Sequence, residues 1–287
     1  MLKSKETTSV QIAPRIASIA KDDWDRCAGT SNPFVSHAFL SILEESGCVG
    51  EKAGWLPQHL AIEDEDGRLV AAAPLYLKSH SYGEYVFDWT WADAYERAGG
   101  NYYPKLQSSI PFTPVTGPRL LVRPDANAQE FRLLLAAAMI ELSRQFNLSS
   151  IHITFCTQSE QRDLERTGFL PRKGMQYHWL NQNYRSFEDF LEGLTSRKRK
   201  AIKKERRKVG EAGIRMDRLT GADIKPHHWD LFHEFYISTS ERKWGVPYLT
   251  QDFWRLLGER LGEKVVLVTA SYEGNVVGAA LNLAGED

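Results

Sequence analysis

Cysteine is scarce in this sequence, and no apolar run is long. The 287 residues include three cysteines, Cys27, Cys48 and Cys156, and no two of them form a CxxC pair. This spacing predicts neither a disulfide framework nor a zinc site built on paired cysteines. No apolar run approaches the roughly 18 residues of a membrane-spanning helix, and the polar N-terminal segment lacks the apolar centre of a signal peptide. We therefore expect a cytoplasmic protein.

Several catalytic signatures are also missing. The sequence has no GxSxG elbow, no Walker loop, no dinucleotide-binding glycine motif and no HExxH pattern. His228 and His233 are five residues apart, whereas a helical zinc pair lies at i and i+4, so we predict no metal site. Five other histidines have no partner that the sequence reveals: His37, His59, His80, His152 and His178.

Charge is balanced overall but unevenly distributed. The chain has 36 basic and 37 acidic residues, and nine of the twelve residues in Arg197–Lys208 are Lys or Arg, with one acidic residue among them. Without this run the chain keeps 27 basic (36 − 9) and 36 acidic (37 − 1) residues, a charge of about −9. A basic island on an acidic body predicts an anionic partner that binds locally.

Apolar periodicity predicts strands and helices up to about residue 181. The predicted strands cover 11–19, 59–62, 69–77, 82–88, 150–155 and 175–181, and the segment 111–122 leads out of an irregular stretch into a further strand. One predicted helix begins at Lys21, and three others cover 34–46, 128–146 and 159–167. Segment 89–118 is expected to be irregular. This order is typical of a mixed sheet flanked by helices, an α+β fold with α/β-like alternation. We assign it to a first domain, residues 1–182.

Residues 183–287 repeat the first half of that order. The predicted elements are a helix over 187–194, a basic helix capped by Ser196, a strand over 214–219, helices over 228–241 and 251–261, and strands over 264–270 and 276–283. Similar strings recur at offsets of 205, about 207 and 214 residues, which predicts a duplicated fold. The copy stops after Leu283, so we expect a partial second domain and a truncated chain.

A dense aromatic and acidic stretch is the strongest candidate for a catalytic site. A general base that deprotonates an ammonium nucleophile is a carboxylate or tyrosine whose pKa burial brings near neutrality. The predicted catalytic residues are Asp88, Asp93 and Tyr103. The predicted substrate-binding residues are Trp89, Trp91, Tyr95, Tyr102, Lys105, Thr113 and Thr116. Alternatively, the aromatics pack an irregular loop, the aspartates cap turns, and the prolines beside the two threonines shape an edge strand.

The basic helix is a second candidate site. Its inward stripe is predicted to run through Ala201, Ile202, Glu205 and Val209, which leaves the cations outside. The predicted anion-binding residues are Arg197, Lys198, Arg199, Lys200, Lys203, Lys204, Arg206 and Arg207. Partners that fit are an anionic small molecule, a carrier-linked substrate, RNA, or peripheral contact with the inner membrane surface. A merely solvated helix face is the alternative.

Three segments carry a resemblance to a known family. The element order is similar to the acyl-CoA N-acyltransferase (GNAT) fold, and GFLPRKGMQYHWLN followed by SFEDFLEGLTSRKRKAIKKERRKV resembles the FemAB-type tandem arrangement. The run FDWTWADAY…YYPKL…PFTPVTG resembles the bacterial FemAB-like family described as peptidoglycan biosynthesis/recognition. The resemblance implies tandem GNAT-like domains. It also implies transfer of an acyl or aminoacyl group to an amine, with acyl-CoA or aminoacyl-tRNA as donor and without a metal.

One segment departs from that pattern. GNAT proteins bind the CoA pyrophosphate at a Gly-rich loop and the following helix N-terminus. The equivalent segment, 122–129, has no glycine, so a helix end capped by Asp125 or Asn127 is the favoured interpretation and a phosphate contact from Arg123 the alternative. This departure favours a second hypothesis, a non-catalytic module that recognises an anionic cell-wall precursor or RNA through the basic helix. The aromatic and acidic stretch favours an enzyme.

Overall fold

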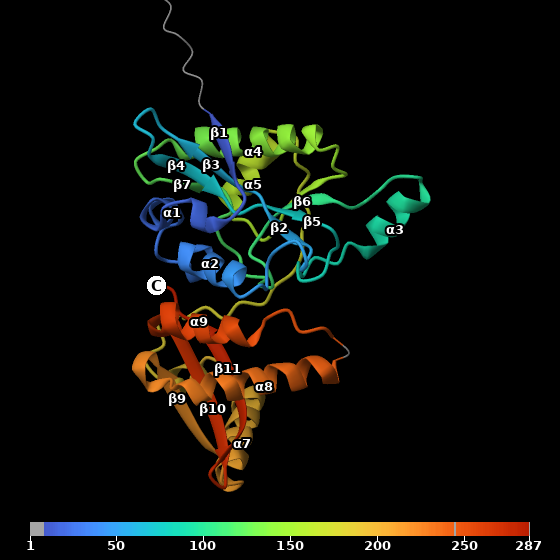
Figure 1. Ribbon diagram of the computed structural model, residues 1–287. Coiled ribbons are helices and arrows are strands. Elements are labelled where there is room, and N and C mark those ends of the chain that lie inside the picture. Colours follow the sequence, from blue (N-terminus) through green and yellow to red (C-terminus); the bar gives the residue numbers. More distant parts are fainter. Residues whose placement is uncertain (1–8, 244, 287) are drawn as a thin grey trace, which may run out of the picture.

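The computed structural model describes residues 9–243 and 245–286 and shows two lobes (Figure 1). The upper lobe holds two four-stranded sheets, and the lower lobe holds a three-stranded sheet. Helices pack beside the strands in both lobes, which confirms the mixed α+β class. The division at residues 182 and 183 stays a prediction.

The first sheet of the upper lobe has the order β1-β3-β4-β7, with every neighbouring pair antiparallel. Its strands are β1 (Val10–Ala13), β3 (His59–Glu63), β4 (Leu69–Ala73) and β7 (Leu121–Val122). The helices of this part of the chain are α1 (Lys21–Ala28), α2 (His37–Glu45), α4 (Ala128–Gln145) and α5 (Gln158–Glu165). Leu135 and Met139 of α4 pack into a buried cluster with Leu60 and Ile62 of β3, so α4 covers this sheet.

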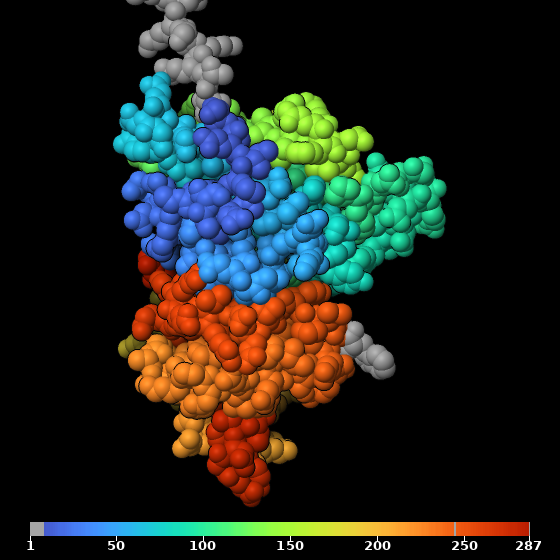
Figure 2. All heavy atoms as spheres, viewed as in Figure 1, coloured from blue at the N-terminus to red at the C-terminus, as the bar shows by residue number. Residues whose placement is uncertain are grey.

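The second sheet has the order β2-β5-β6-β8 and carries the candidate site. Its strands are β2 (Trp55–Pro57), β5 (Tyr76–Lys78), β6 (Lys105–Ser108) and β8 (Ile151–Ile153). β6 and β8 are parallel, and the other two pairs are antiparallel. Helix α3 (Trp89–Arg97) lies in the connection between β5 and β6 and stands out from the body (Figures 1 and 2).

The lower lobe contains the sheet β11-β10-β9. Its elements are α6 (Phe187–Glu192), α7 (Ser196–Glu211), β9 (Arg215–Thr220), α8 (Pro226–Arg242), α9 (Gln251–Leu261), β10 (Val265–Tyr272) and β11 (Asn275–Leu283). The hairpin between β10 and β11 turns through Glu273 and Gly274, both at positive φ, as expected for a two-residue loop.

The predicted internal repeat is present in the structure. The order β1–α1–α2–β3–β4, interrupted by the short β2 of the second sheet, recurs as β9–α8–α9–β10–β11. In each copy the first strand of the hairpin (β3 or β10) pairs with the strand before the helices and with the second strand of the hairpin. The first residues of matching elements are 205 (215 − 10), 205 (226 − 21), 214 (251 − 37), 206 (265 − 59) and 206 (275 − 69) positions apart. The chain therefore contains two copies of one strand–helix–helix–hairpin unit, one in each lobe.

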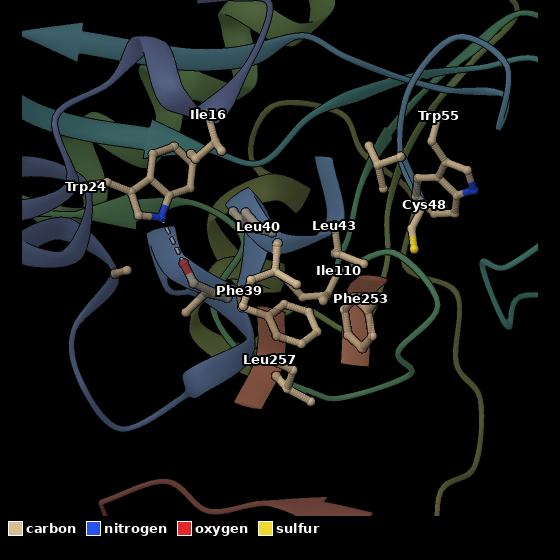
Figure 3. Close-up of a cluster of buried hydrophobic side chains, with 14 of the residues drawn as sticks. Ile16, Trp24, Phe39, Leu40, Leu43, Cys48, Trp55, Ile110, Phe253 and Leu257 are labelled. Carbon is tan, nitrogen blue, oxygen red and sulfur yellow. Dashed lines mark hydrogen bonds between the residues drawn. The ribbon is translucent and has the colours of Figure 1, made fainter. Parts of the chain in front are cut away.

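The matching helices α2 and α9 pack against each other and join the lobes (Figure 3). Phe39 and Phe253 meet edge to face with ring centroids 6.0 Å apart, and both are buried. At the rim, Arg260 Nη1 donates to Glu45 Oε1 at 2.7 Å. Burial of large aromatic side chains at this contact stabilises the join.

Four predicted segments differ from the structure. The apolar run 69–77 splits at Pro74 into β4 and β5, which belong to different sheets. Segment 82–88 is no strand, because Gly83 and Tyr85 have left-handed φ values of 79° and 56° that end the extended backbone. All of 175–181 is described, and it forms no strand despite its alternating pattern. Segment 89–118, expected to be irregular, contains α3 and β6.

Candidate active site

Two lysines lie opposite each other inside the second sheet. Lys78 ends β5 and pairs across the strands with Lys105, the first residue of β6, while Trp55 of β2 pairs with Lys78 on its other side. All three side chains are fully buried. Like charges opposite each other on a sheet repel, and a buried charge is costly unless it is paired. These lysines therefore require acceptors from nearby segments.

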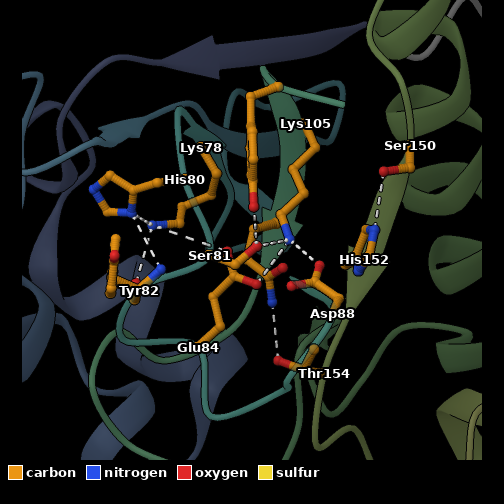
Figure 4. Close-up of polar contacts among 12 residues, drawn as sticks. Lys78, His80, Ser81, Tyr82, Glu84, Asp88, Lys105, Ser150, His152 and Thr154 are labelled. Carbon is orange, nitrogen blue, oxygen red and sulfur yellow. Dashed lines mark hydrogen bonds and ion pairs between the residues drawn. The ribbon is translucent and has the colours of Figure 1, made fainter. Parts of the chain in front are cut away.

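The loop that follows β5 supplies the acceptors for Lys105 (Figure 4). Lys105 Nζ donates to Ser81 Oγ at 2.8 Å, to Glu84 Oε2 at 2.9 Å and to Asp88 Oδ2 at 2.6 Å. All three acceptors are buried. The left-handed turn at Gly83 and Tyr85 lets one short loop bring three oxygens to a single ammonium group. We call Lys78, Ser81, Glu84, Asp88 and Lys105 the lysine–carboxylate cluster.

Two tyrosines border this cluster. Tyr102 donates its hydroxyl hydrogen to Asp88 Oδ2 at 2.8 Å, and Tyr103 Oη lies 2.8 Å from Ser81 Oγ. His152 of β8 approaches Tyr102 Oη at 3.5 Å through Nε2. The structure thus brings together four residues predicted for the site: Asp88, Tyr102, Tyr103 and Lys105.

Burial and pairing shift the pKa values of the cluster in different directions. Burial opposes ionisation of Asp88, but hydrogen bonds from Lys105, Ser81 and Tyr102 outweigh it and lower the pKa of Asp88. Burial raises the pKa of Glu84, against the pull of Lys105. Burial also lowers the pKa of Lys78 to about 7 and that of His152 to about 4. Asp88 is therefore a fixed carboxylate rather than a group that titrates near neutrality.

Comparison with known proteins identifies the family. A family model described as FemAB-like, peptidoglycan biosynthesis/recognition, matches residues 15–287. The chain belongs to the FemAB-like family. This match confirms the resemblance inferred from the FDWTWADAY…YYPKL…PFTPVTG run, and it includes every residue of the lysine–carboxylate cluster.

Two further comparisons complete this result. A search of curated proteins found no match to this FemAB-like chain. Among solved structures, an acetyltransferase from Trypanosoma brucei is similar over 60% of this chain and 99% of its own length, with 14% identity and a TM-score of 0.37.

The α3 residues lie outside the lysine–carboxylate cluster of the FemAB-like chain. Trp89, Trp91, Asp93 and Tyr95 are all exposed, with 53% of Trp91 accessible, although Arg172 covers the Trp91 ring at 4.5 Å. The expectation that these aromatics wall off water is therefore wrong. A helix distributes successive side chains around its axis, and only the Ala92 face of α3 is buried.

The two threonines also have other partners. Thr113 Oγ1 donates to the carbonyl of Pro111 at 3.2 Å, and Thr116 Oγ1 donates to Gln176 Oε1 at 3.2 Å. Nearby, the fully buried Arg119 donates to the carbonyls of Thr154, Pro118 and Val115. These hydrogen bonds hold the segment, but residues 111–118 form no strand, so the edge strand of the alternative interpretation is not found here.

Several cluster residues escaped the sequence analysis. Lys78, Ser81 and Glu84 were not predicted, although a lysine inside the apolar run PLYLK is an unusual signal. The sequence revealed no partner for His80 or His152, and the structure provides one for each. His80 Nδ1 lies 3.5 Å from Lys78 Nζ, and His152 approaches Tyr102 and lies 2.9 Å from Ser150 Oγ.

The remaining lone histidines are also paired. His59 Nε2 lies 2.8 Å from Glu44 Oε1 in the core, His37 Nε2 lies 3.1 Å from the Ile16 carbonyl, and His178 contacts Gln176. The contacts of His59 and His37 join separate elements of the upper lobe. Among residues 9–243 and 245–286 no group of His, Cys, Asp and Glu is arranged to hold a metal ion.

The basic helix α7 begins with Ser196 and its N-cap residue is Thr195, so both the cap and the helix start lie one position earlier than predicted. The whole helix is described, and none of its side chains is buried; 38% of Val209 is accessible. The predicted inward stripe is therefore wrong, since α8 and α9 provide the residues of the lower core. Lys203 pairs with Glu188 at 2.7 Å, and Arg206 covers the Phe187 ring at 4.2 Å.

The segment before α4 is a capped helix end. Asn127 Oδ1 accepts from the amide of Glu130, and Arg123 pairs with Asp125 at 2.6 Å and with Asp64 at 3.2 Å. The capping interpretation is confirmed for Asn127. Two carboxylates already neutralise Arg123.

No helix within the described parts of the chain is long and apolar enough to cross a bilayer.

Proposed function

We propose that this FemAB-like protein transfers an acyl or aminoacyl group to an amine of a cell-wall precursor, and that the lysine–carboxylate cluster is its polar centre. One observation supports this assignment most strongly. Asp88 Oδ1 and Glu84 Oε1 are buried, and neither has a hydrogen-bond partner among the described residues. A buried carboxylate oxygen without a donor favours an amine or ammonium ligand, which supplies N–H groups.

The chemistry assigns a role to each residue. The acceptor nitrogen attacks the carbonyl carbon, a C–N bond forms, and the bond from that carbon to the donor's sulfur or oxygen breaks. The leaving group takes one proton, and a substrate that enters as an ammonium ion releases a second one to solvent. The positive charge of Lys105 stabilises the negative charge on the carbonyl oxygen through space, because Ser81, Glu84 and Asp88 already take its three N–H groups. Asp88 holds Lys105 in place, and Tyr103, which is half-buried, contacts the substrate.

The donor belongs to the same proposal. Acyl-CoA and aminoacyl-tRNA are both polyanions, and the exposed cations of α7 suit either of them or a carrier-linked substrate. Such donors occur in the cytoplasm, and a lipid-linked precursor would bring the protein to the inner membrane surface. The internal repeat supports a tandem GNAT-like organisation as part of this proposal.

An assay with separate donors tests the function. The purified chain is incubated with a peptidoglycan precursor that carries a free amine, and with either acetyl-CoA or aminoacyl-tRNA. We expect mass spectrometry to find an amide product whose mass has increased by one acyl or aminoacyl group. A precursor whose amine is blocked by acetylation is the matched control and should give no product. Absence of product with both donor classes, from folded protein, would contradict the proposal.

Exposed cations on α7 also favour a second candidate function, a non-catalytic module that binds an anionic ligand. Under this hypothesis the double variant Lys198→Glu/Lys200→Glu binds a short single-stranded RNA more weakly, with a salt slope smaller by about 0.7 per lost phosphate contact. Fluorescence anisotropy at two salt concentrations measures both effects. The exposed pair Lys52→Glu/Lys243→Glu is the control, and an equal loss in this control would argue against a site on α7.

A further inference from the structure

The two opposed lysines differ in what holds their protons. Lys105 Nζ has three oxygen acceptors within 2.9 Å, and two of them are carboxylates. Lys78 Nζ has a backbone carbonyl, that of Tyr82, at 3.3 Å, and His80 Nδ1 at 3.5 Å. It also lies over the Trp55 ring, 3.6 Å from the centroid. Its nearest carboxylate oxygen, Glu84 Oε1, is 3.9 Å away, which is too far for a hydrogen bond.

Every charged group around Lys78 belongs to the same buried region. Glu84 and Asp88 favour its charged form, and Lys105, directly opposite on β6, disfavours it. His80 lies beside it, and burial together with Lys78 lowers the pKa of this histidine, so it adds no charge near neutrality. Because burial is the largest effect, it lowers the pKa of Lys78 to about 7. When Lys78 is charged, the net charge of the two lysines and two carboxylates of the cluster is zero. When Lys78 is neutral, that net charge is −1.

Glu84 connects the two lysines. Its Oε2 accepts from Lys105, while its Oε1 faces Lys78 and has no hydrogen-bond partner among the described residues. When Lys78 is protonated, one carboxylate is shared between two ammonium groups. When Lys78 is neutral, the same carboxylate acts on Lys105 alone, and its attraction in this dry region is strong.

We propose that Lys78 is a positioning residue of the site, which gains and loses one proton and thereby sets how firmly Glu84 holds the Lys105 ammonium group. Its effect on turnover depends on the transfer reaction proposed above, whereas its titration does not. We expect the neutral form to be the active one, because Lys105 is then held by two carboxylates without competition. Turnover should therefore fall as the pH drops through 7.

Two variants fix Lys78 in one charge state each. Lys78→Met removes the titrating amine at similar volume, and Lys78→Arg keeps a charge that cannot be removed. In a pH profile of kcat from 6 to 9, both variants should lose the inflection near pH 7. The kcat of Lys78→Met should stay at the upper plateau of the unaltered protein, and the kcat of Lys78→Arg should stay at the lower plateau. A purely structural role would lower kcat by the same factor at every pH and leave the inflection in place.

Two measurements on the protein itself do not need activity, and they serve if the arginine variant fails to fold. NMR of labelled lysine side chains should show one amine titrating near pH 7, and this signal should be missing in Lys78→Met. Stability gives the same information. A folded pKa of about 7, below the ordinary 10.5, means that the unfolded chain binds more protons between these values. Stability from this group therefore rises with pH over that window.

The stability comparison has a matched control. Chemical unfolding of the unaltered protein and of Lys52→Met, which changes an exposed lysine, should show the rise between pH 7 and 9, and Lys78→Met should not. Parallel curves for all three proteins, or a Lys78 amine that stays protonated to pH 10, would overturn the inference. Titration of Lys78 without transfer from any donor would instead refute only the proposed function. Transfer with an unchanged inflection in Lys78→Met would refute only the role of Lys78.

Discussion

Replacement of Lys105 by methionine is expected to destabilise the protein by about 3–5 kcal/mol, because it removes the shared partner of two buried carboxylates. Lys105 Nζ is the only donor within hydrogen-bond distance of Glu84 in the described structure, and it is 2.6 Å from Asp88 Oδ2. Without it both carboxylates remain in a dry interior, where they must become protonated or force the loop open. Urea unfolding at pH 7, followed by tryptophan fluorescence, measures the loss.

Two further variants separate charge from packing. Lys52→Met makes the same substitution at an exposed position and should change stability by no more than about 0.5 kcal/mol. Adding Glu84→Gln and Asp88→Asn to Lys105→Met neutralises the stranded carboxylates and should recover much of the loss. If Lys105→Met unfolds at the same urea concentration as the unaltered protein, the buried ion pairs do not stabilise the fold in the way described.

Asp88→Asn is expected to lower the rate of acyl transfer by about 100- to 1,000-fold, the range seen when a preorganised transition-state contact is lost. Asparagine keeps the shape of the side chain but not its charge, so Lys105 loses its closest counter-ion, at 2.6 Å. The Asp88→Ala change is less informative, because it would add a cavity beside an unpaired lysine. The product assay described above, run at saturating substrate, gives the rate.

Asp93→Asn is the matched control for Asp88→Asn. Both aspartates belong to the same aromatic stretch, but Asp93 is exposed on α3, so we expect this variant to keep most of the activity. Tyr103→Phe should have an intermediate effect, about tenfold, since it removes one hydroxyl that contacts Ser81. Equal losses of activity in Asp88→Asn and Asp93→Asn would show that the buried cluster is not the catalytic centre. Helix α3 would then be the candidate catalytic site.

Much of the fold was predictable because local patterns decide it. The helix predicted over 128–146 is α4 (Ala128–Gln145). The strand predicted over 59–62 and the first part of the one predicted over 69–77 are the paired strands β3 and β4, joined by a turn in which Gly67 has a φ of 75°. Helical spacing of apolar residues and a turn that needs left-handed backbone act over a few residues, so neither requires knowledge of distant segments. The repeat was visible for the same reason, since both copies carry these local signals in one order.

Segment 82–88 shows where local patterns fail. Its alternating aromatic and polar residues favour a strand, yet the backbone turns at Gly83 and Tyr85 and the side chains of Glu84 and Asp88 point to Lys105. The ion pairs connect residues up to 21 positions apart, and their energy depends on burial that the segment alone does not determine. Propensity favoured a strand, and tertiary contacts outweighed it.

The sequence by itself determined much of the element order, the internal repeat and the charge of α7, and it singled out the stretch that contains Asp88, Tyr102, Tyr103 and Lys105 as a candidate site. The tertiary structure alone decided that Lys78 lies opposite Lys105, that Glu84 lies between them, and that Asp93 lies outside. Strand register brings distant residues face to face, and burial then determines which of their charges persist, so neither property can be obtained from the order of residues along the chain.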